Sequence, residues 1–162
     1  MLAMIPSVVR GVGSNDLERI KSIARKAYPG VPQLSTRILS EWMQGGDTST
    51  LLLVDVRAPA EFKVSQLRGA VNLQSANQIT RAVTDRNPAK TVLYCSVGFR
   101  SSRLAHIVAL RDIQNVFNLE GSIFQWANEG REIYRGETPV HQVHPYGCRW
   151  SSLLKPGLAS DC

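Results

Sequence analysis

Two short apolar runs constrain the fold of this 162-residue chain more than any other feature. Residues 51–56 read LLLVDV and residues 91–94 read TVLY, without the alternation of a strand that has one face in water. Continuous runs of this kind are typical of strands that are buried on both faces of a parallel sheet. Because parallel strands need crossover connections, helices are expected between them. The two runs therefore predict an α/β domain.

Helical patterns and helix-start signals fill the chain between and around these runs. Helices are predicted over residues 15–27, 35–44, 59–62, 77–83, 100–111 and 121–128, and shorter strands over 69–73 and 115–119. Strands that alternate with helices at this pitch indicate one parallel sheet with helices on its faces.

The composition predicts a single folded domain with extensions at both ends. Hydrophobic residues make up 43% of the chain and charged residues 20%, which is ordinary for a globular protein. We expect a lead-in and a helix over residues 1–30 and the main domain over 31–135. In residues 136–162, prolines and glycines replace the periodic pattern. An irregular tail, either wrapped on the domain or partly disordered, is expected there.

The charge of the chain favours anionic partners. A formal net charge of +6 attracts anions, but there is no run of five basic residues and no basic stripe interleaved with aromatic residues. We therefore expect a small anionic substrate and no nucleic acid. The apolar stretch near the N-terminus is bounded by Pro6 and Arg10, which is too short for a membrane span and makes a poor secretory signal. A cytoplasmic protein without a membrane partner is the expectation.

The three cysteines, Cys95, Cys148 and Cys162, form no C-x-x-C pair. An odd, widely spaced set favours neither a disulfide framework nor a zinc site, and it suits a reducing compartment. His141 and His144 precede Cys148 at a metal-like spacing, but the proline-rich tail offers no obvious fourth ligand, so no metal is expected. The alternative for Cys148 and Cys162 is a role as resolving thiols for Cys95. Trp150 is expected to pack rather than to bind a ligand.

Cys95 is the candidate nucleophile because it ends the second apolar run. Ligands of open α/β sheets bind at the carboxyl ends of strands, and backbone amides at a helix start favour a thiolate. Gly98 permits a positive φ, and Arg100 supplies a positive charge that can bind an oxyanion with two hydrogen bonds. The alternative for a cysteine at this position is an inert core residue. The expected anion site consists of Ser96, Val97, Gly98, Phe99, Arg100 and Ser101.

Asp55 and Arg57 end the neighbouring strand. One interpretation is a structural ion pair at the sheet edge. The other is that Arg57 adds to the positive field over the anion site, with Asp55 supporting it. Glu61 is expected to pair with a nearby base or to cap a backbone amide.

Three motifs, in order along residues 35–134, resemble the rhodanese family of sulfurtransferases. Cys95, Gly98, Arg100 and Ser101 match the family's catalytic loop, C-x-x-G-x-(R/T)-(S/T). The other two matches are D-x-R…E-(F/Y)…G-A-x-N, at residues 55–72, and an element like L-x-G-G…W, at residues 119–126. The chain departs from the pattern at residues 65–67, where Gly-His-Ile is usual, and at Ser122, where glycine is common.

The resemblance implies a three-layer fold with a central, mainly parallel five-stranded sheet and a two-step reaction. The Cys95 thiolate attacks the sulfane sulfur of a donor such as thiosulfate or 3-mercaptopyruvate, with thiosulfate favoured, and forms a persulfide. The persulfide passes its sulfur to cyanide, a thiol or an acceptor protein, and no metal or organic cofactor is required.

Two alternatives stay open. A cysteine-dependent phosphatase or arsenate reductase holds five residues between cysteine and arginine, whereas this chain has four, a loop better suited to sulfur than to phosphate. The domain could also act as a persulfide carrier or a regulatory rhodanese module.

Overall fold

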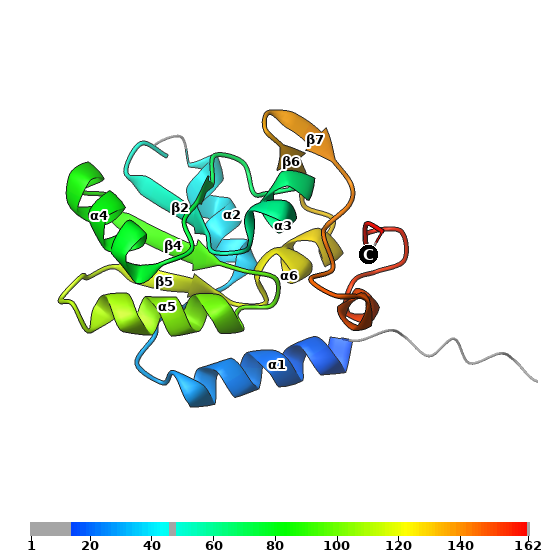
Figure 1. The fold of residues 1–162 in the computed structure, drawn as a ribbon, viewed down its shortest axis with the longest axis horizontal. Helices are drawn as coiled ribbons and strands as arrows, with labels where there is room; N and C mark the ends of the chain where they lie inside the picture. Colours follow the sequence, from blue (N-terminus) through cyan, green and yellow to red (C-terminus); the bar gives the residue numbers. More distant parts are fainter. Residues whose placement is uncertain (1–13, 46–47, 162) are drawn as a thin grey trace, which may run out of the picture.

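A five-stranded parallel sheet forms the centre of the computed structural model, which describes residues 14–45 and 48–161 (Figure 1). The strand order is β1-β5-β4-β2-β3. The strands are β1 (Gln33–Leu34), β2 (Leu51–Asp55), β3 (Val71–Asn72), β4 (Lys90–Tyr94) and β5 (Val116–Leu119). The lead-in expected over residues 1–13, and Cys162, lie outside the described residues. The predicted α/β fold with a parallel sheet between helices is confirmed.

The two apolar runs form neighbouring strands in the middle of the sheet, β2 and β4, which pair in register from Leu51 with Lys90 to Asp55 with Tyr94. Their side chains alternate between two apolar clusters. Leu53 and Tyr94 face one cluster, and Leu52 and Leu93 face the other. Because both faces are covered, apolar residues occupy successive positions in the middle of these strands.

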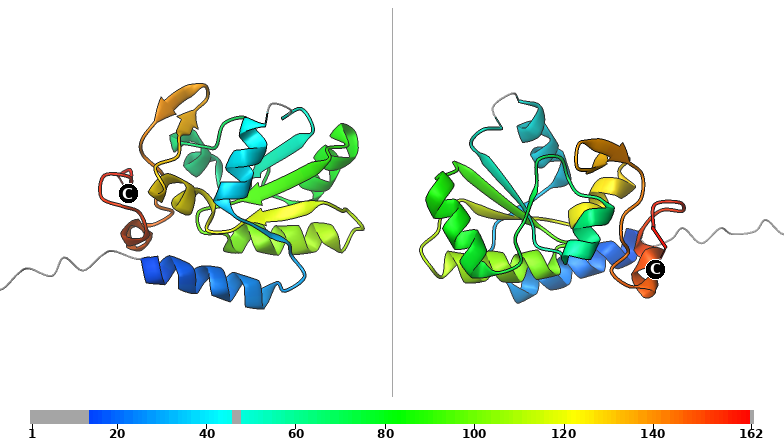
Figure 2. Two further views of the ribbon diagram at one scale, coloured as in Figure 1. Left: turned by 180° about the vertical axis from the view of Figure 1, so that it is seen from behind. Right: turned by 45° about the horizontal axis from the view of Figure 1, so that its top comes forward.

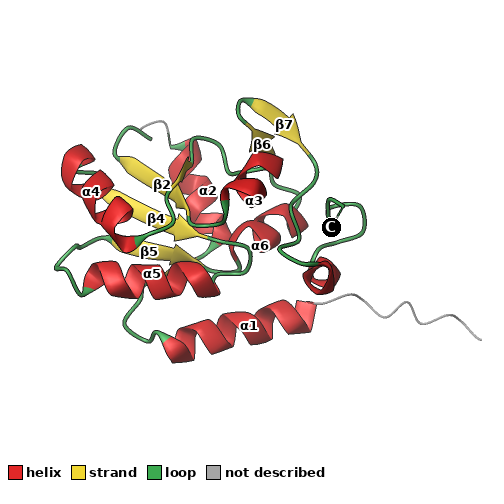
Figure 3. Cartoon of the chain, in the orientation of Figure 1, coloured by secondary structure: helices red, strands yellow, loops and turns green. Residues whose placement is uncertain are grey.

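Helices cover both faces of the sheet, as Figure 3 shows. Residues of α2 (Thr36–Gln44) and α6 (Ser122–Asn128) belong to the first cluster, and those of α4 (Ala76–Arg86) and α5 (Phe99–Ala109) to the second. A shorter helix, α3 (Pro59–Val64), follows β2. Local signals set the helix starts: the Ser35 hydroxyl accepts the Ile38 N–H, and Ser75 forms a capping box with Gln78.

The N-terminal helix and the C-terminal segment pack together outside the sheet. Helix α1 (Ser14–Ala27) lies along α5, and the 3-10 helix η1 (Cys148–Leu153) lies near the start of α1 (Figure 2). Leu17 and Leu153 are buried in the same apolar cluster. The Lys21 ammonium donates to the Gln125 side-chain oxygen at 3.0 Å and thereby ties α1 to α6.

The segment expected to be irregular contains regular elements. A hairpin joins β6 (Ile133–Arg135) and β7 (Thr138–Val140), and η1 follows. Val143 and Leu154 are buried here, but such residues are too widely spaced to produce a periodic pattern. None of the helices in the described part of the chain combines the length and the hydropathy that a membrane span requires.

Candidate active site

The loop after β4 places Cys95 at the carboxyl edge of the sheet, and α5 begins at Phe99. The start of α6 holds the beginning of this loop. The Cys95 carbonyl accepts the Ile123 N–H at 3.2 Å, and the Cys95 N–H donates to the Ser122 hydroxyl oxygen at 3.1 Å. Ser122, where the sequence departs from the rhodanese pattern, therefore anchors the nucleophile. Sequence reasoning noted the departure but not this role.

The surroundings of the Cys95 thiol favour its ionised form. Its Sγ accepts hydrogen bonds from the Gly98 N–H at 3.2 Å and the Ser101 hydroxyl at 3.5 Å. Burial raises the pKa of the Cys95 thiol, but the charge of Arg100 and the hydrogen bonds from Ser101 and Gly98 outweigh burial, so the pKa is lowered overall. A larger thiolate fraction at neutral pH makes Cys95 a better nucleophile than an ordinary thiol.

Arg100 is held by Glu61 rather than left free for a ligand. Its two terminal nitrogens donate to the Glu61 carboxylate at 2.9 and 2.8 Å, and one of them also donates to the Ser96 hydroxyl at 3.0 Å. Burial raises the pKa of Glu61, but the Arg100 guanidinium and the Ala58 N–H outweigh it and lower the pKa below its usual range. Arg100 acts on the sulfur through its charge. Its bidentate hydrogen bonds go to Glu61 and not to a bound oxyanion. Glu61 both pairs with a base and caps a backbone amide, which confirms the expectation for it.

Arg57 does not reach the anion loop. Its side chain is fully buried and binds Asp55 through Nε at 3.0 Å and through Nη2 at 2.6 Å. Nη2 also donates to the Ser65 carbonyl at 2.6 Å. Because Asp55 neutralises the charge of Arg57 inside the protein, the geometry favours the structural ion pair over a contribution of Arg57 to the positive field at the anion site.

Gly98 satisfies a backbone requirement of the loop. Its φ is +99°, and a Cβ there would lie 3.3 Å from the Asn118 side-chain nitrogen. We expect Gly98→Ala to lower the free energy of unfolding by about 1–2 kcal/mol, because an L side chain is strained in this region. It is also expected to disturb the N–H that binds Sγ, and so to move the pH midpoint of Cys95 alkylation upward. Urea unfolding and iodoacetamide kinetics measure the two effects, and a variant with wild-type values in both would contradict them.

Arg100→Gln tests the source of the lowered thiol pKa. Loss of the cation leaves Glu61 unpaired near the sulfur, so the pKa of Cys95 is expected to rise. The rate of Cys95 alkylation by iodoacetamide, followed against pH, should therefore reach half its maximum at a higher pH than in the wild type. Arg103→Gln is the matched control, since it removes the same charge from an exposed position of the same helix. Equal midpoints for Arg100→Gln and Arg103→Gln would show that the Arg100 charge does not act on the sulfur.

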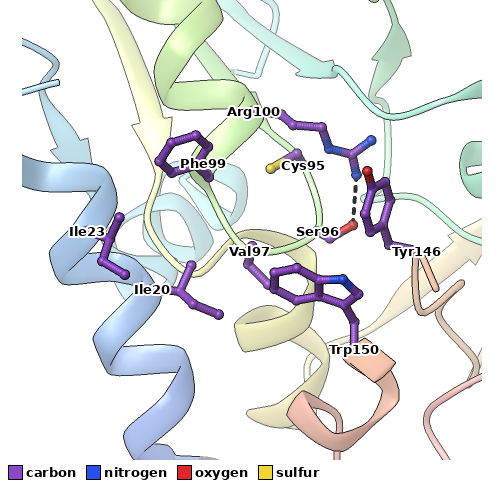
Figure 4. A pocket seen from close by; sticks show the side chains of 9 residues that line it. All are labelled: Ile20, Ile23, Cys95, Ser96, Val97, Phe99, Arg100, Tyr146 and Trp150. Carbon is purple, nitrogen blue, oxygen red and sulfur yellow. Dashed lines mark hydrogen bonds between the residues drawn. The ribbon is translucent and has the colours of Figure 1, made fainter. Parts of the chain in front are cut away.

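A pocket of about 320 Å³ opens over the cysteine (Figure 4). The loop and the start of α5 form its floor, α1 forms one side, and the C-terminal segment forms the other. Trp150, which was expected only to pack, lies on the side that the C-terminal segment forms. Phe99, predicted from the loop, lines the pocket too. The lining side chains are Ile20, Ile23, Cys95, Ser96, Val97, Phe99, Arg100, Tyr146 and Trp150.

The family model called Rhodanese-like domain matches residues 35–129, more than half of the chain and all of the Cys95 loop. The chain belongs to the rhodanese family. The matched region excludes α1 and η1, so this rhodanese builds two walls of its pocket from segments outside the family domain.

Curated relatives of this rhodanese include a sulfurtransferase and tRNA hydroxylases. A sulfurtransferase of Allochromatium vinosum is 30% identical over 107 residues, which cover 66% of this chain and 98% of that protein. A tRNA uridine(34) hydroxylase of Bordetella pertussis is 30% identical over 125 residues, which cover 67% of this chain and 51% of that protein. The chain thus spans about half the length of the hydroxylase.

A solved structure shares the fold. The thiosulfate sulfurtransferase of Pseudomonas aeruginosa superposes with a TM-score of 0.62 at 17% identity, over 75% of this chain and 23% of that one. At this identity the likeness concerns the fold alone.

Proposed function

We propose that this rhodanese is a sulfurtransferase that carries a sulfane sulfur as a persulfide on Cys95. The observation that carries the proposal is the environment of Sγ. The thiol has a lowered pKa, accepts hydrogen bonds from Gly98 and Ser101, and lines a pocket. The likeness to a sulfurtransferase over nearly that protein's whole length supports the same chemistry.

The first step loads the cysteine. The Cys95 thiolate attacks the outer sulfur of a small anionic donor such as thiosulfate, the S–S bond of the donor breaks, and sulfite leaves with the electron pair. The new terminal sulfur of the persulfide is an anion. The backbone N–H groups of Gly98 and Ser101, which bind Sγ, are placed to stabilise it without reorganisation.

The second step unloads the sulfur. A nucleophilic acceptor, either cyanide or a thiol of a small molecule or a protein, attacks the terminal sulfur, and the Cys95 thiolate is regenerated as the leaving group. In both steps the attacking nucleophile supplies the electron pair of the new bond and the leaving group takes the pair of the broken S–S bond, so the sulfur keeps its oxidation level. The reaction therefore needs neither an oxidant nor a separate base once Cys95 is ionised.

A persulfide carrier would accept sulfur from a small donor but would not pass it to a small-molecule acceptor. A phosphatase would instead hold a tetrahedral oxyanion against the cysteine with a free arginine. The engagement of Arg100 by Glu61 disfavours that reaction, because both terminal guanidinium nitrogens are already occupied.

Steady-state kinetics with thiosulfate and cyanide test the proposal. A persulfide intermediate predicts thiocyanate formation and parallel lines in double-reciprocal plots at several fixed cyanide concentrations, since the donor product leaves before the acceptor binds. Hydrolysis of an aryl phosphate without any thiocyanate would overturn the proposal in favour of the phosphatase. Sulfur uptake without turnover would limit the function to persulfide carriage.

A further inference from the structure

The walls of the Cys95 pocket are apolar to an unusual degree for a site that handles an anion. Of the four large apolar side chains that are exposed in the described part of the chain, three line this pocket: Ile23 at 47%, Phe99 at 38% and Tyr146 at 53%. Exposed apolar side chains gathered at one place mark a binding surface. Ile20 adds to the side that α1 forms, and Trp150 adds to the side that the C-terminal segment forms (Figure 4).

The charges around the pocket favour a ligand that carries one negative charge next to the Cys95 sulfur and no charge against the apolar walls. Among the described residues that line the pocket, Arg100 is the one charged side chain, and the Glu61 carboxylate accepts two hydrogen bonds from it. The other arginine of the motif, Arg57, is neutralised by Asp55 in the interior. A dianion such as thiosulfate would have to place its second charge against apolar walls, which is costly without a partner.

The aromatic side of the pocket is held in place. Tyr146 has a φ of +69°, and its N–H donates to His144 Nδ1 at 3.0 Å. Its ring lies 4.6 Å from the Arg100 guanidinium carbon and 6.1 Å from the Trp150 ring. An exposed aromatic residue in this strained backbone conformation persists only where its surroundings fix it. The fixed ring closes the space between the loop and η1.

We propose that the sulfur donor is an organic compound, in which the sulfane sulfur is attached to a compact apolar group that binds between α1 and the C-terminal segment. This inference rests on the function proposed above and names the class of substrate. The donor's sulfane sulfur lies against Cys95 Sγ, and the apolar group contacts Ile23 and Trp150. A pocket of about 320 Å³ lies at the lower end of the range for small organic ligands and has room for a ring or a branched chain.

The transfer balances with thiosulfonates as the probes. The Cys95 thiolate attacks the terminal sulfur, the bond between that sulfur and the sulfonyl sulfur breaks, and the organic sulfinate leaves with the electron pair. Benzenethiosulfonate and methanethiosulfonate share the same anionic head and differ only in the apolar group. To correct for intrinsic reactivity, the enzymatic rate with each probe is divided by the rate at which the same probe reacts with a free small thiol. The ratio of the two corrected rates then measures how strongly the pocket prefers the larger apolar group.

The experiment measures kcat/KM for both probes, with cyanide as acceptor. The full chain is expected to prefer the benzene compound by about tenfold or more after normalisation, because burial of a ring removes apolar surface from water. Ile23→Ser and Trp150→Ser are expected to reduce the preference at least fivefold. Ile23 is half-exposed, so its substitution leaves the fold intact. Leu110→Ser, an exposed apolar position outside the pocket, is the matched control and should keep the preference.

A normalised ratio near one, or a ratio that Ile23→Ser leaves unchanged, would overturn the inference. Thiosulfate, measured beside the two probes, distinguishes a failure of this inference from a failure of the proposed function. If thiosulfate loads Cys95 while the probes show no preference, the inference fails and the proposed function stands. If no donor loads Cys95, the proposed function itself fails.

Discussion

Replacing Cys95 by serine is expected to lower the rate of thiocyanate formation from thiosulfate and cyanide by about a thousandfold or more, down to the background reaction. A serine hydroxyl remains protonated at neutral pH and is a far weaker nucleophile toward sulfur. The hydrogen bonds from Gly98 and Ser101 that favour a thiolate cannot compensate for this difference, because they lower the pKa of the group without changing its element. The thiocyanate assay at saturating donor measures the loss.

Cys148→Ser is the matched control for this variant. Cys148 is a free, exposed cysteine in η1, between Tyr146 and Trp150 of the pocket wall but not among the lining residues. If Cys95 alone carries the sulfur, Cys148→Ser retains the wild-type rate. Substantial activity in Cys95→Ser, together with a loss in Cys148→Ser, would show that Cys148 rather than Cys95 carries the sulfur.

The second large effect is on stability. Asp55→Ala is expected to lower the free energy of unfolding by about 3–5 kcal/mol, because it leaves the Arg57 guanidinium buried without its counter-ion. Both side chains are fully buried, and the pair is joined by hydrogen bonds from Nε and Nη2 of Arg57. Burial lowers the pKa of Arg57, but the adjacent Asp55 carboxylate outweighs it, so the arginine stays charged inside the protein. Urea denaturation measures the loss.

Asp85→Ala supplies the comparison for this measurement. Asp85 pairs with Arg81 on α4, at 3.7 Å, with both side chains mostly exposed. An exposed pair of this type contributes less than about 0.5 kcal/mol. Similar losses for Asp55→Ala and Asp85→Ala would contradict the claim that the buried pair supports the end of β2.

The central strands were predictable for a physical reason, and the peripheral elements were not. Burial on both faces favoured consecutive apolar residues in β2 and β4, and such runs are visible in a sequence. By contrast, β1 has two residues, Gln33 and Leu34, and is defined by its pairing with β5. No local pattern of two residues can express a pairing with a strand more than eighty positions away. The elements of the C-terminal segment depend in the same way on contacts with α1 and the main domain.

At the site, residues within one loop were easier to predict than residues that meet only in three dimensions. The C-x-x-G-x-R-S spacing identified Cys95, Gly98 and Arg100 in a single stretch. The partner that holds Arg100 comes from α3, the anchor of the Cys95 N–H comes from α6, and the pocket walls come from both ends of the chain. Both interpretations of Arg57 stayed open in the sequence because its position at a strand end can be predicted, whereas the direction of its side chain cannot.

The mass of the protein after incubation with thiosulfate tests the central claim most directly. The account predicts that the intact mass increases by one sulfur atom, that peptide mapping places the sulfur on Cys95, and that cyanide removes it as thiocyanate. The Cys95→Ser variant should show no increase under the same conditions. A wild-type mass that neither thiosulfate nor benzenethiosulfonate changes, or a sulfur that remains on the Cys95→Ser variant, would contradict the assignment of Cys95 as the sulfur carrier.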